Sequence, residues 1–271
     1  MNPDKKLLKV TRKSQQKRRV RGSGEPNSEL FSTIEAYKTL RTNLQFTFKN
    51  QKGNVISITS ALPHSGKSTI VANIAVAFAQ AGYKVLIIDA DLRKPRICKF
   101  FDLPLSPGLS NYIAGLTDFD NVVRSTKFDN LKVITSGQIP PNPAEILNSV
   151  KMEKLILKAR EDYDVIFIDT PPVNLVTDAV VVTKYADGSI LVVRHYVTTH
   201  NELAYAIKSF ELVNAKVLGV ILNAVDYQKS HGKSYRYYSK SAYYRGGYYS
   251  QYSSAYSEPD AKINNTIIDK D

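Results

Sequence analysis

The feature that most constrains this chain is the ten-residue stretch at positions 60–69, which reads Ser-Ala-Leu-Pro-His-Ser-Gly-Lys-Ser-Thr. An apolar run before it predicts a strand at 55–59, and an alanine-rich apolar run after it predicts a helix at 68–81. A strand, a tight loop ending in Gly-Lys-Ser-Thr and a helix are together typical of a phosphate-binding loop, or P-loop. The N–H groups that begin a helix have no partner inside it and lie at the positive end of its dipole, so a polyphosphate fits there.

The loop supplies the candidate nucleotide-binding residues, with ATP and Mg²⁺ as the expected ligands. Lys67 is expected to reach the β- and γ-phosphates, and the Ser68 hydroxyl is expected to ligate Mg²⁺. The first position of the loop, which is usually Gly, is Ala61. The residues expected to contact the nucleotide are Pro63, His64, Ser65, Gly66, Lys67, Ser68 and Thr69.

Six apolar runs that alternate with helical patterns predict the fold class. Four of the runs are dense in Val, Ile and Leu without alternation, as expected for strands covered on both faces. We therefore predict an α/β P-loop fold, with a mostly parallel sheet flanked by helices and right-handed crossovers. The strands are expected at 55–59, 85–88, 131–134, 165–168, 190–193 and 217–222. The helices are expected at 29–48, 68–81, 143–160, 177–185 and 201–214, with a short one at 109–114.

Acidic residues follow two of the predicted strands. Asp89 and Asp91 come after the strand at 85–88, and Asp169 follows the strand at 165–168. Because ligands bind at the carboxyl ends of parallel strands, we expect these carboxylates beside the P-loop, where a bound Mg²⁺ would remove their mutual repulsion. Asp169 and Asp91 are therefore candidate metal ligands together with Ser68. Lys67, Asp89 and Asp91 are the candidate catalytic residues, and either aspartate could accept the proton of an incoming hydroxyl.

Both ends of the chain differ in composition from the predicted domain at 29–225. Residues 1–28 are predicted to be a disordered basic arm, since nine of the first 24 are Lys or Arg and one is acidic; the whole chain has a net charge of +12. Such an arm suits anionic lipid, nucleic acid or an acidic partner, or is a solvated tail. Residues 226–271 are predicted to be a disordered tail, and nine of the chain's 17 tyrosines lie there between positions 235 and 256. These tyrosines are Tyr235, Tyr237, Tyr238, Tyr243, Tyr244, Tyr248, Tyr249, Tyr252 and Tyr256.

The single cysteine, Cys98, excludes an internal disulfide framework and fits a reducing compartment. No apolar run approaches the ~20 residues needed to cross a bilayer, and no signal-peptide core is found near the start. The expected location is therefore the cytoplasm.

These motifs resemble those of the bacterial tyrosine kinases (BY-kinases) of Gram-positive capsule and exopolysaccharide systems. The resemblance rests on the P-loop at 60–69, the acidic motif at 86–95, the strand-end motif at 165–172 and the tyrosine-rich tail, and it covers residues 29–256. The stretch Glu35-Ala36-Tyr37-Lys38-Thr39-Leu40-Arg41 is similar to the family's oligomerisation motif, Glu-x-x-Arg-x-x-Arg. Glu35, Lys38 and Arg41 are the candidate oligomerisation residues on that basis.

The resemblance implies ATP-dependent phosphorylation of protein tyrosine, mainly on the tail of a neighbouring subunit in a ring-shaped homo-oligomer. It implies regulation of polysaccharide synthesis and export, a cognate tyrosine phosphatase, and a separate transmembrane adaptor that holds the kinase at the inner face of the membrane. The nine tail tyrosines would be its autophosphorylation sites. Two departures weaken the match: His64-Ser65 replaces the family's Gly-Glu, and Lys38 replaces an Arg and loses its bidentate fork.

Two further residues have open roles. Asn223 ends the last predicted strand and could read adenine, although a strand-end turn residue is an equally good interpretation. Arg93 could neutralise transition-state charge or brace the acidic loop, and we favour the brace.

Two other functions match parts of the sequence. A partitioning or septum-placing P-loop ATPase would carry a signature lysine five residues before Lys67, where this chain has Leu62. A nucleic-acid-binding module could use the basic arm and the tyrosine tail, but no aromatic β-ribbon or zinc-ligand spacing supports it, so nucleic acid is not an expected partner.

Overall fold

The computed structural model describes residues 26–48 and 52–225, and of residues 26–32 it describes the backbone alone. Residues 1–25 of the predicted basic arm and all of the predicted tail lie outside the described residues, and the nine candidate acceptor tyrosines lie there with the tail. None of the helices in the described ranges is long and apolar enough to cross a membrane.

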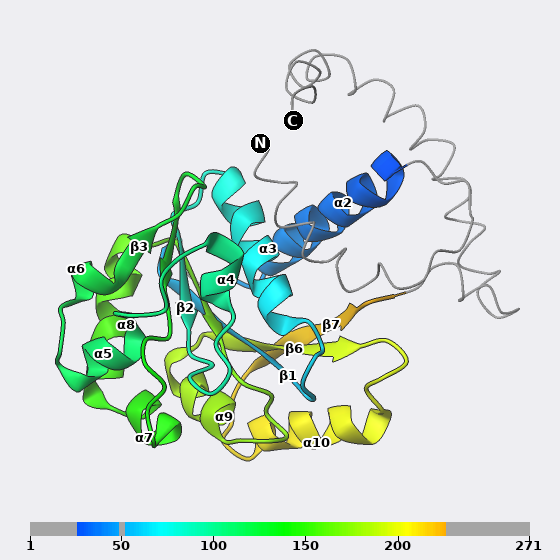
Figure 1. Ribbon diagram of the computed structural model, residues 1–271. Coiled ribbons are helices and arrows are strands. Elements are labelled where there is room, and N and C mark those ends of the chain that lie inside the picture. The colour runs from blue at the N-terminus through cyan, green and yellow to red at the C-terminus, as the bar shows by residue number, and fades with distance from the viewer. Residues whose placement is uncertain (1–25, 49–51, 226–271) are drawn as a thin grey trace, which may run out of the picture. The chain divides into compact units, whose positions relative to one another are not determined.

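A seven-stranded sheet organises the described chain, in the order β3-β4-β2-β5-β1-β6-β7 (Figure 1). All neighbouring strands are parallel except β3 and β4, which are antiparallel. The six predicted strands are confirmed, each within two residues at either end. The sequence analysis missed β3, a three-residue edge strand. The strands are β1 Asn54–Ser60, β2 Val85–Asp89, β3 Val123–Ser125, β4 Leu131–Ile134, β5 Val165–Asp169, β6 Gly188–Arg194 and β7 Val217–Asn223.

Helices connect most of these strands. They are α2 Pro26–Gln45, α3 Lys67–Gln80, α4 Ile97–Phe101, α5 Leu109–Ala114, α6 Phe119–Val122, α7 Pro143–Leu147, α8 Val150–Asp162, α9 Asp178–Val182 and α10 His200–Glu211, with a 3₁₀ turn η1 at Thr183–Tyr185.

Four of the predicted helices differ from the structure. The one expected at 201–214 ends at Glu211. The helix expected at 29–48 begins at Pro26, a residue that is favoured in a first helical turn, and ends at Gln45. The helix expected at 143–160 is two helices, because Ser149 caps a new one by accepting a hydrogen bond from the Met152 N–H (3.2 Å). The helix expected at 177–185 becomes a 3₁₀ turn after Val182.

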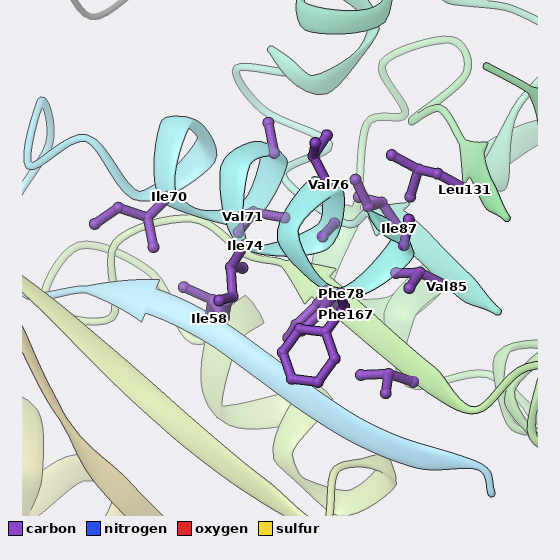
Figure 2. Packing of buried hydrophobic residues seen from close by; sticks show 14 of the residues in the cluster. Ile58, Ile70, Val71, Ile74, Val76, Phe78, Val85, Ile87, Leu131 and Phe167 are labelled. Atoms are coloured by element: carbon purple, nitrogen blue, oxygen red, sulfur yellow. The ribbon is translucent and has the colours of Figure 1, made fainter. Parts of the chain in front are cut away.

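Helices cover both faces of the sheet, so the central strands are buried on both sides, as their unbroken apolar runs predicted. On one face, α3 packs on β1, β2 and β5, with α2 and α4 beside it (Figure 1). Figure 2 shows the α3 side chains reaching the strands, with Phe78 against Phe167 at 5.5 Å between ring centroids. The other face is covered by α5, α6, α8 and α9, and further along by α10. The sheet therefore holds the carboxyl ends of its strands in fixed register beside the start of α3.

Candidate active site

The P-loop joins β1 to α3, as the sequence predicted. Gly66 lies just before the helix with φ 88°, a left-handed conformation that favours glycine. A Cβ on Gly66 would lie 2.2 Å from the Asn223 amide nitrogen, so a larger residue would have to displace the Asn223 side chain. Lys67 and Ser68 form the first turn of α3, where backbone N–H groups and the helix dipole favour an anion.

Hydrogen bonds inside the loop fix its path. The hydroxyls of Ser60 and Ser65 both donate to the Leu62 carbonyl, at 2.8 and 2.7 Å. The exposed His64 has φ 61°, so it occupies a left-handed conformation at a position where the resembled family has Gly. Asn223 reaches the same loop, since its amide nitrogen donates to the Ser65 carbonyl at 2.8 Å. This contact gives Asn223 a structural role beside the loop. A contact between Asn223 and adenine stays a prediction.

The acidic strand ends lie beside the loop. Asp89 and Asp169 are directly opposite each other where β2 pairs with β5. The Lys67 ammonium donates to Asp91 Oδ2 (3.0 Å) and to Asp169 Oδ1 (2.9 Å), and it lies 3.3 Å from Ser68 Oγ. The sequence analysis predicted that the three carboxylates would meet the P-loop at one edge of the sheet, and the structure places them there. It did not foresee that Lys67 would pair with two of them.

Burial controls the charge states in this cluster. Asp89 and Asp169 are fully buried, and Lys67 and Asp91 nearly so. Burial, with the negative charge of Asp169, holds the pKa of Asp89 well above its usual range. Burial also raises the pKa of Asp169, although Lys67 opposes that change. The pKa of Lys67 is raised, because Asp169 and Asp91 together outweigh the lowering that burial alone would cause.

The two aspartates of the acidic motif also hold the loop that follows β2. Asp89 accepts hydrogen bonds from the backbone N–H groups of Asp91 (3.3 Å) and Ile97 (3.1 Å). Asp91 Oδ1 accepts from the N–H of Lys94 at 3.0 Å, while its other oxygen pairs with Lys67. The loop is therefore folded around these carboxylates, and Asp91 is the more exposed of the two.

The oxygens at this edge fit a Mg²⁺ ion that is shared with phosphates. Asp169 Oδ2 is buried and makes no hydrogen bond, so one carboxylate oxygen is free for a metal ion or its bound water. In the described part of the chain, no cluster of three or more His, Cys, Asp or Glu side chains could hold a metal by itself. Such an ion therefore needs phosphate oxygens, water and the Ser68 hydroxyl as further ligands, as is usual for Mg²⁺.

Arg93 braces the acidic loop from outside. Its guanidinium makes a bidentate pair with Asp178 at the start of α9, with Nε–Oδ2 at 2.9 Å and Nη2–Oδ1 at 3.0 Å. The Asp178 carboxylate is fully buried, whereas Arg93 is partly exposed. Asp178 was not predicted as a partner because it lies 85 residues from Arg93 in the sequence. The only feature that marks Asp178 in the sequence is its place as an acidic residue in the first turn of a helix. The structure supports the bracing role for Arg93 that the sequence favoured.

Replacing Arg93 by Ala should lower the free energy of unfolding by about 2 kcal/mol, because the buried Asp178 carboxylate loses its partner. The loss is limited because Arg93 is partly exposed, so solvent weakens the pair. Urea denaturation at pH 7 measures the change. Lys158→Ala is the matched control, since Lys158 pairs with the exposed Asp120 at 3.3 Å; we expect a loss below about 1 kcal/mol there. Equal losses in the two variants would contradict a special role for the Arg93–Asp178 pair.

The candidate oligomerisation residues lie on α2, which packs on α3. Lys38 and Glu35 form an exposed ion pair of 2.8 Å within the helix. Arg41 turns toward α3 and donates to the Ala77 carbonyl at 2.8 Å. Next to it, Tyr37 accepts a hydrogen bond from Asn73, and burial raises its pKa to about 12. Contact with a neighbouring subunit stays a prediction for all three candidate residues.

Comparison with known proteins decides the family. The profile of the AAA domain family matches residues 48–218. The tyrosine-protein kinase YwqD of Bacillus subtilis is 40% identical over 231 residues, which cover 85% of this chain and 95% of YwqD. The chain belongs to the bacterial tyrosine-kinase family. CapB of Staphylococcus aureus is 41% identical over 76% of this kinase and 90% of CapB.

Solved structures agree with this assignment. The kinase domain of the Escherichia coli tyrosine kinase Etk superposes with a TM-score of 0.72 and 35% identity, covering 81% of this chain and 87% of the domain. The cell-division ATPase MinD of Pyrococcus furiosus gives a TM-score of 0.57 and 26% identity over 66% of this chain and 74% of MinD. The kinase relatives thus match better than the septum-placing ATPase that was the alternative. In this kinase Leu62, where that ATPase class has its signature lysine, packs against an apolar cluster under α10.

Proposed function

We propose that this kinase transfers the γ-phosphoryl group of ATP to tyrosines in the tail of a neighbouring copy, and that the cycle regulates the synthesis and export of an extracellular polysaccharide. The observation that carries the proposal is Lys67 at the start of α3, hydrogen-bonded to Asp91 and Asp169 and beside the buried Asp89. A phosphate anchor and three carboxylates at one sheet edge are what phosphoryl transfer to a hydroxyl needs.

Each residue of the cluster has a proposed part in the transfer. Lys67 exchanges its carboxylate partners for the β- and γ-phosphates. These carry more negative charge than the carboxylates and therefore attract the ammonium. Asp169 and Asp91, with Ser68, would hold Mg²⁺, which would neutralise charge on the transferring phosphoryl group. A tyrosine hydroxyl with a pKa near ~10 must lose its proton as transfer proceeds, and Asp89 or Asp91 accepts it. The raised pKa of Asp89 fits a proton acceptor, while the hydrogen bond of Asp91 to Lys67 fits a place beside the phosphates and the metal.

The acceptors are proposed to be the nine tyrosines between positions 235 and 256. Three of them stand singly and six form three adjacent pairs among Gly, Ser, Lys and Arg, a composition with no apolar pattern that would bury their phenols in a core. Transfer in trans requires copies to meet, and α2 with Glu35, Lys38 and Arg41 is the proposed contact, forming a ring.

A mixing experiment tests both the kinase activity and whether the phosphoryl group passes from one copy to another. The chain with the nine tyrosines changed to Phe keeps the P-loop and is expected to be an active donor without acceptor sites. The Lys67→Met chain keeps the acceptor tyrosines and is expected to be inactive. With radiolabelled ATP and Mg²⁺, neither variant alone should gain phosphotyrosine, and the mixture should label the Lys67→Met chain. Label on the nine-Phe chain would contradict the nine tyrosines as the acceptor sites, and no label in the mixture would contradict transfer in trans.

The partners are proposed from the relatives. Only 28% of full-length E. coli Etk matches this chain, so Etk carries much sequence beyond the shared region, whereas YwqD matches over 95% of its length. We infer that this kinase works in the cytoplasm with a separate transmembrane adaptor, which holds it at the inner face of the membrane, and that a tyrosine phosphatase reverses the reaction. Co-purification of the kinase with membranes from cells that contain or lack the adaptor would test this arrangement.

A further inference from the structure

Two consecutive carbonyl groups of the P-loop are held by side chains from outside the loop. The guanidinium Nη1 of Arg194, at the end of β6, donates to the His64 carbonyl at 3.0 Å. The amide nitrogen of Asn223, at the end of β7, donates to the Ser65 carbonyl at 2.8 Å. Neither β6 nor β7 is part of the P-loop motif, and Arg194 lies 130 residues from His64.

These two contacts determine where the loop N–H groups point. The peptide bonds that follow His64 and Ser65 are trans, so the C=O and N–H of each unit point in opposite directions. Holding the two carbonyls toward β6 and β7 therefore turns the N–H groups of Ser65 and Gly66 the other way. Left-handed His64 and Gly66 flank Ser65, and alternation of this kind gathers N–H groups into a concave anion-binding nest.

The ends of β6 and β7 form a fixed support for the two anchors. The N–H of His195 donates to the Asn223 carbonyl at 2.9 Å, which ties the two strand ends together. The N–H of Arg194 donates to Thr198 Oγ1 at 3.0 Å, and the Arg194 carbonyl accepts from the N–H groups of Val197 and Thr198. The backbone that carries Arg194 is thus a closed turn, so its side chain starts from a defined position.

We propose that Arg194 and Asn223 are positioning residues for the P-loop, which hold the N–H groups of Ser65 and Gly66 toward the polyphosphate of the nucleotide. The proposal rests on the proposed function of the loop as the ATP site. Arg194 has a particular task here, because His64 stands in a left-handed conformation that costs a non-glycine residue about 1 kcal/mol or more. Its hydrogen bond stabilises that conformation and offsets the strain.

Calorimetric titration with two ligands tests the proposal. Mg²⁺–ADP presents phosphates and a base, whereas Mg²⁺–tripolyphosphate presents phosphates alone. Arg194→Ala loses an exposed, charge-assisted hydrogen bond, and Asn223→Ala loses a neutral, partly buried one. Each loss should weaken the binding of both ligands about five- to twentyfold. Arg194→Lys keeps a donor and should recover part of the affinity. In kinase assays, Arg194→Ala should raise the KM for ATP more than it lowers kcat.

The matched control is Arg124→Ala, which removes a similar bond from a guanidinium to a backbone carbonyl, that of Pro107 (3.1 Å), on the edge strand β3. It should leave both affinities unchanged. Arg194→Ala binding both ligands as tightly as the unmodified kinase would overturn the positioning role of Arg194. Asn223→Ala that weakens ADP but not tripolyphosphate binding would assign Asn223 to the base instead. If the unmodified kinase bound neither ligand, the ATP site itself would be refuted rather than its anchors.

Discussion

Lys67→Met is expected to lower the rate of tyrosine phosphorylation at least about a hundredfold, because the transferring phosphoryl group loses the cation that is proposed to face it. The same change should destabilise the ligand-free kinase by about 3 kcal/mol, since Asp91 and Asp169 lose the ammonium that lies 3.0 and 2.9 Å from them. Phosphotyrosine formation over time and urea denaturation measure the two effects.

The stability loss in Lys67→Met should grow with pH. Burial raises the pKa of Asp169 and Lys67 opposes that change, so without the ammonium the pKa of Asp169 rises further in the folded state but not in the unfolded chain. When the pKa of a carboxyl is higher in the folded state than in the unfolded state, raising the pH destabilises the fold. The full stability is present below the unfolded pKa and is lost as the pH rises through the folded pKa. The variant should therefore be closer in stability to the unmodified kinase at pH 5 than at pH 8.

Lys67→Arg separates the two effects of Lys67. Arginine keeps a positive charge between the carboxylates, so most of the stability should return. The arginine guanidinium is larger and planar, so it cannot take the place of a compact ammonium beside the phosphates, and activity should stay low. Full activity in Lys67→Arg, or a stability loss in Lys67→Met that is the same at every pH, would contradict the two roles assigned to Lys67.

The sequence was sufficient to predict how the edge of the sheet is assembled. Parallel strands end at one edge, so Asp89 and Asp169 could be brought together from their places after two apolar runs, without any knowledge of their contacts. The P-loop was predictable because it is local: the strand, the loop and the first turn of α3 are consecutive in the chain. The catalytic and metal-binding roles of these residues remain predictions.

Contacts between distant parts of the chain were beyond sequence reasoning. Arg93 and Asp178 are 85 residues apart, and no periodicity relates them. The pairing of Lys67 with two carboxylates depends on side-chain directions that a pattern of residue types does not contain. Strand β3 was missed because three residues are too few to show alternation.

Asp89→Asn is expected to inactivate the kinase and to stabilise its ligand-free form at neutral pH. The loss of activity should be about a hundredfold or more if Asp89 accepts the phenol proton. The gain in stability follows from the environment of Asp89, which is fully buried near Asp169 and has a pKa well above its usual range. An ionised Asp89 is therefore costly in the folded state at pH 7, and Asn removes that charge. The loss of one hydrogen bond reduces the gain, because the two carboxylate oxygens accept from the N–H groups of Asp91 and Ile97 and an amide nitrogen cannot accept. Stability sacrificed at a site that performs chemistry is a common finding in enzymes.

The pH dependence of this gain gives the decisive measurement. Because the folded pKa of Asp89 is raised, its stabilising contribution is complete below the unfolded pKa near ~4 and is lost as the pH rises through the folded value. The difference in Tm between Asp89→Asn and the unmodified kinase should therefore be small at pH 4.5 and grow toward pH 8, in scans without nucleotide or Mg²⁺. Asp129→Asn, an exposed acid between β3 and β4, should change neither activity nor Tm.

Asp91→Asn distinguishes the two carboxylates of the acidic motif. If Asp89 is the proton acceptor and Asp91 a metal ligand, Asp91→Asn should raise the Mg²⁺ concentration needed for half-maximal activity, and added Mg²⁺ should restore part of the rate. Asp89→Asn should not respond to added Mg²⁺, because a missing proton acceptor is not replaced by a metal. If added Mg²⁺ rescued Asp89→Asn and not Asp91→Asn, Asp91 would be the proton acceptor and Asp89 the metal ligand. Asp91 could take that role, because it contacts Lys67 and would lie beside the γ-phosphate that Lys67 is proposed to bind.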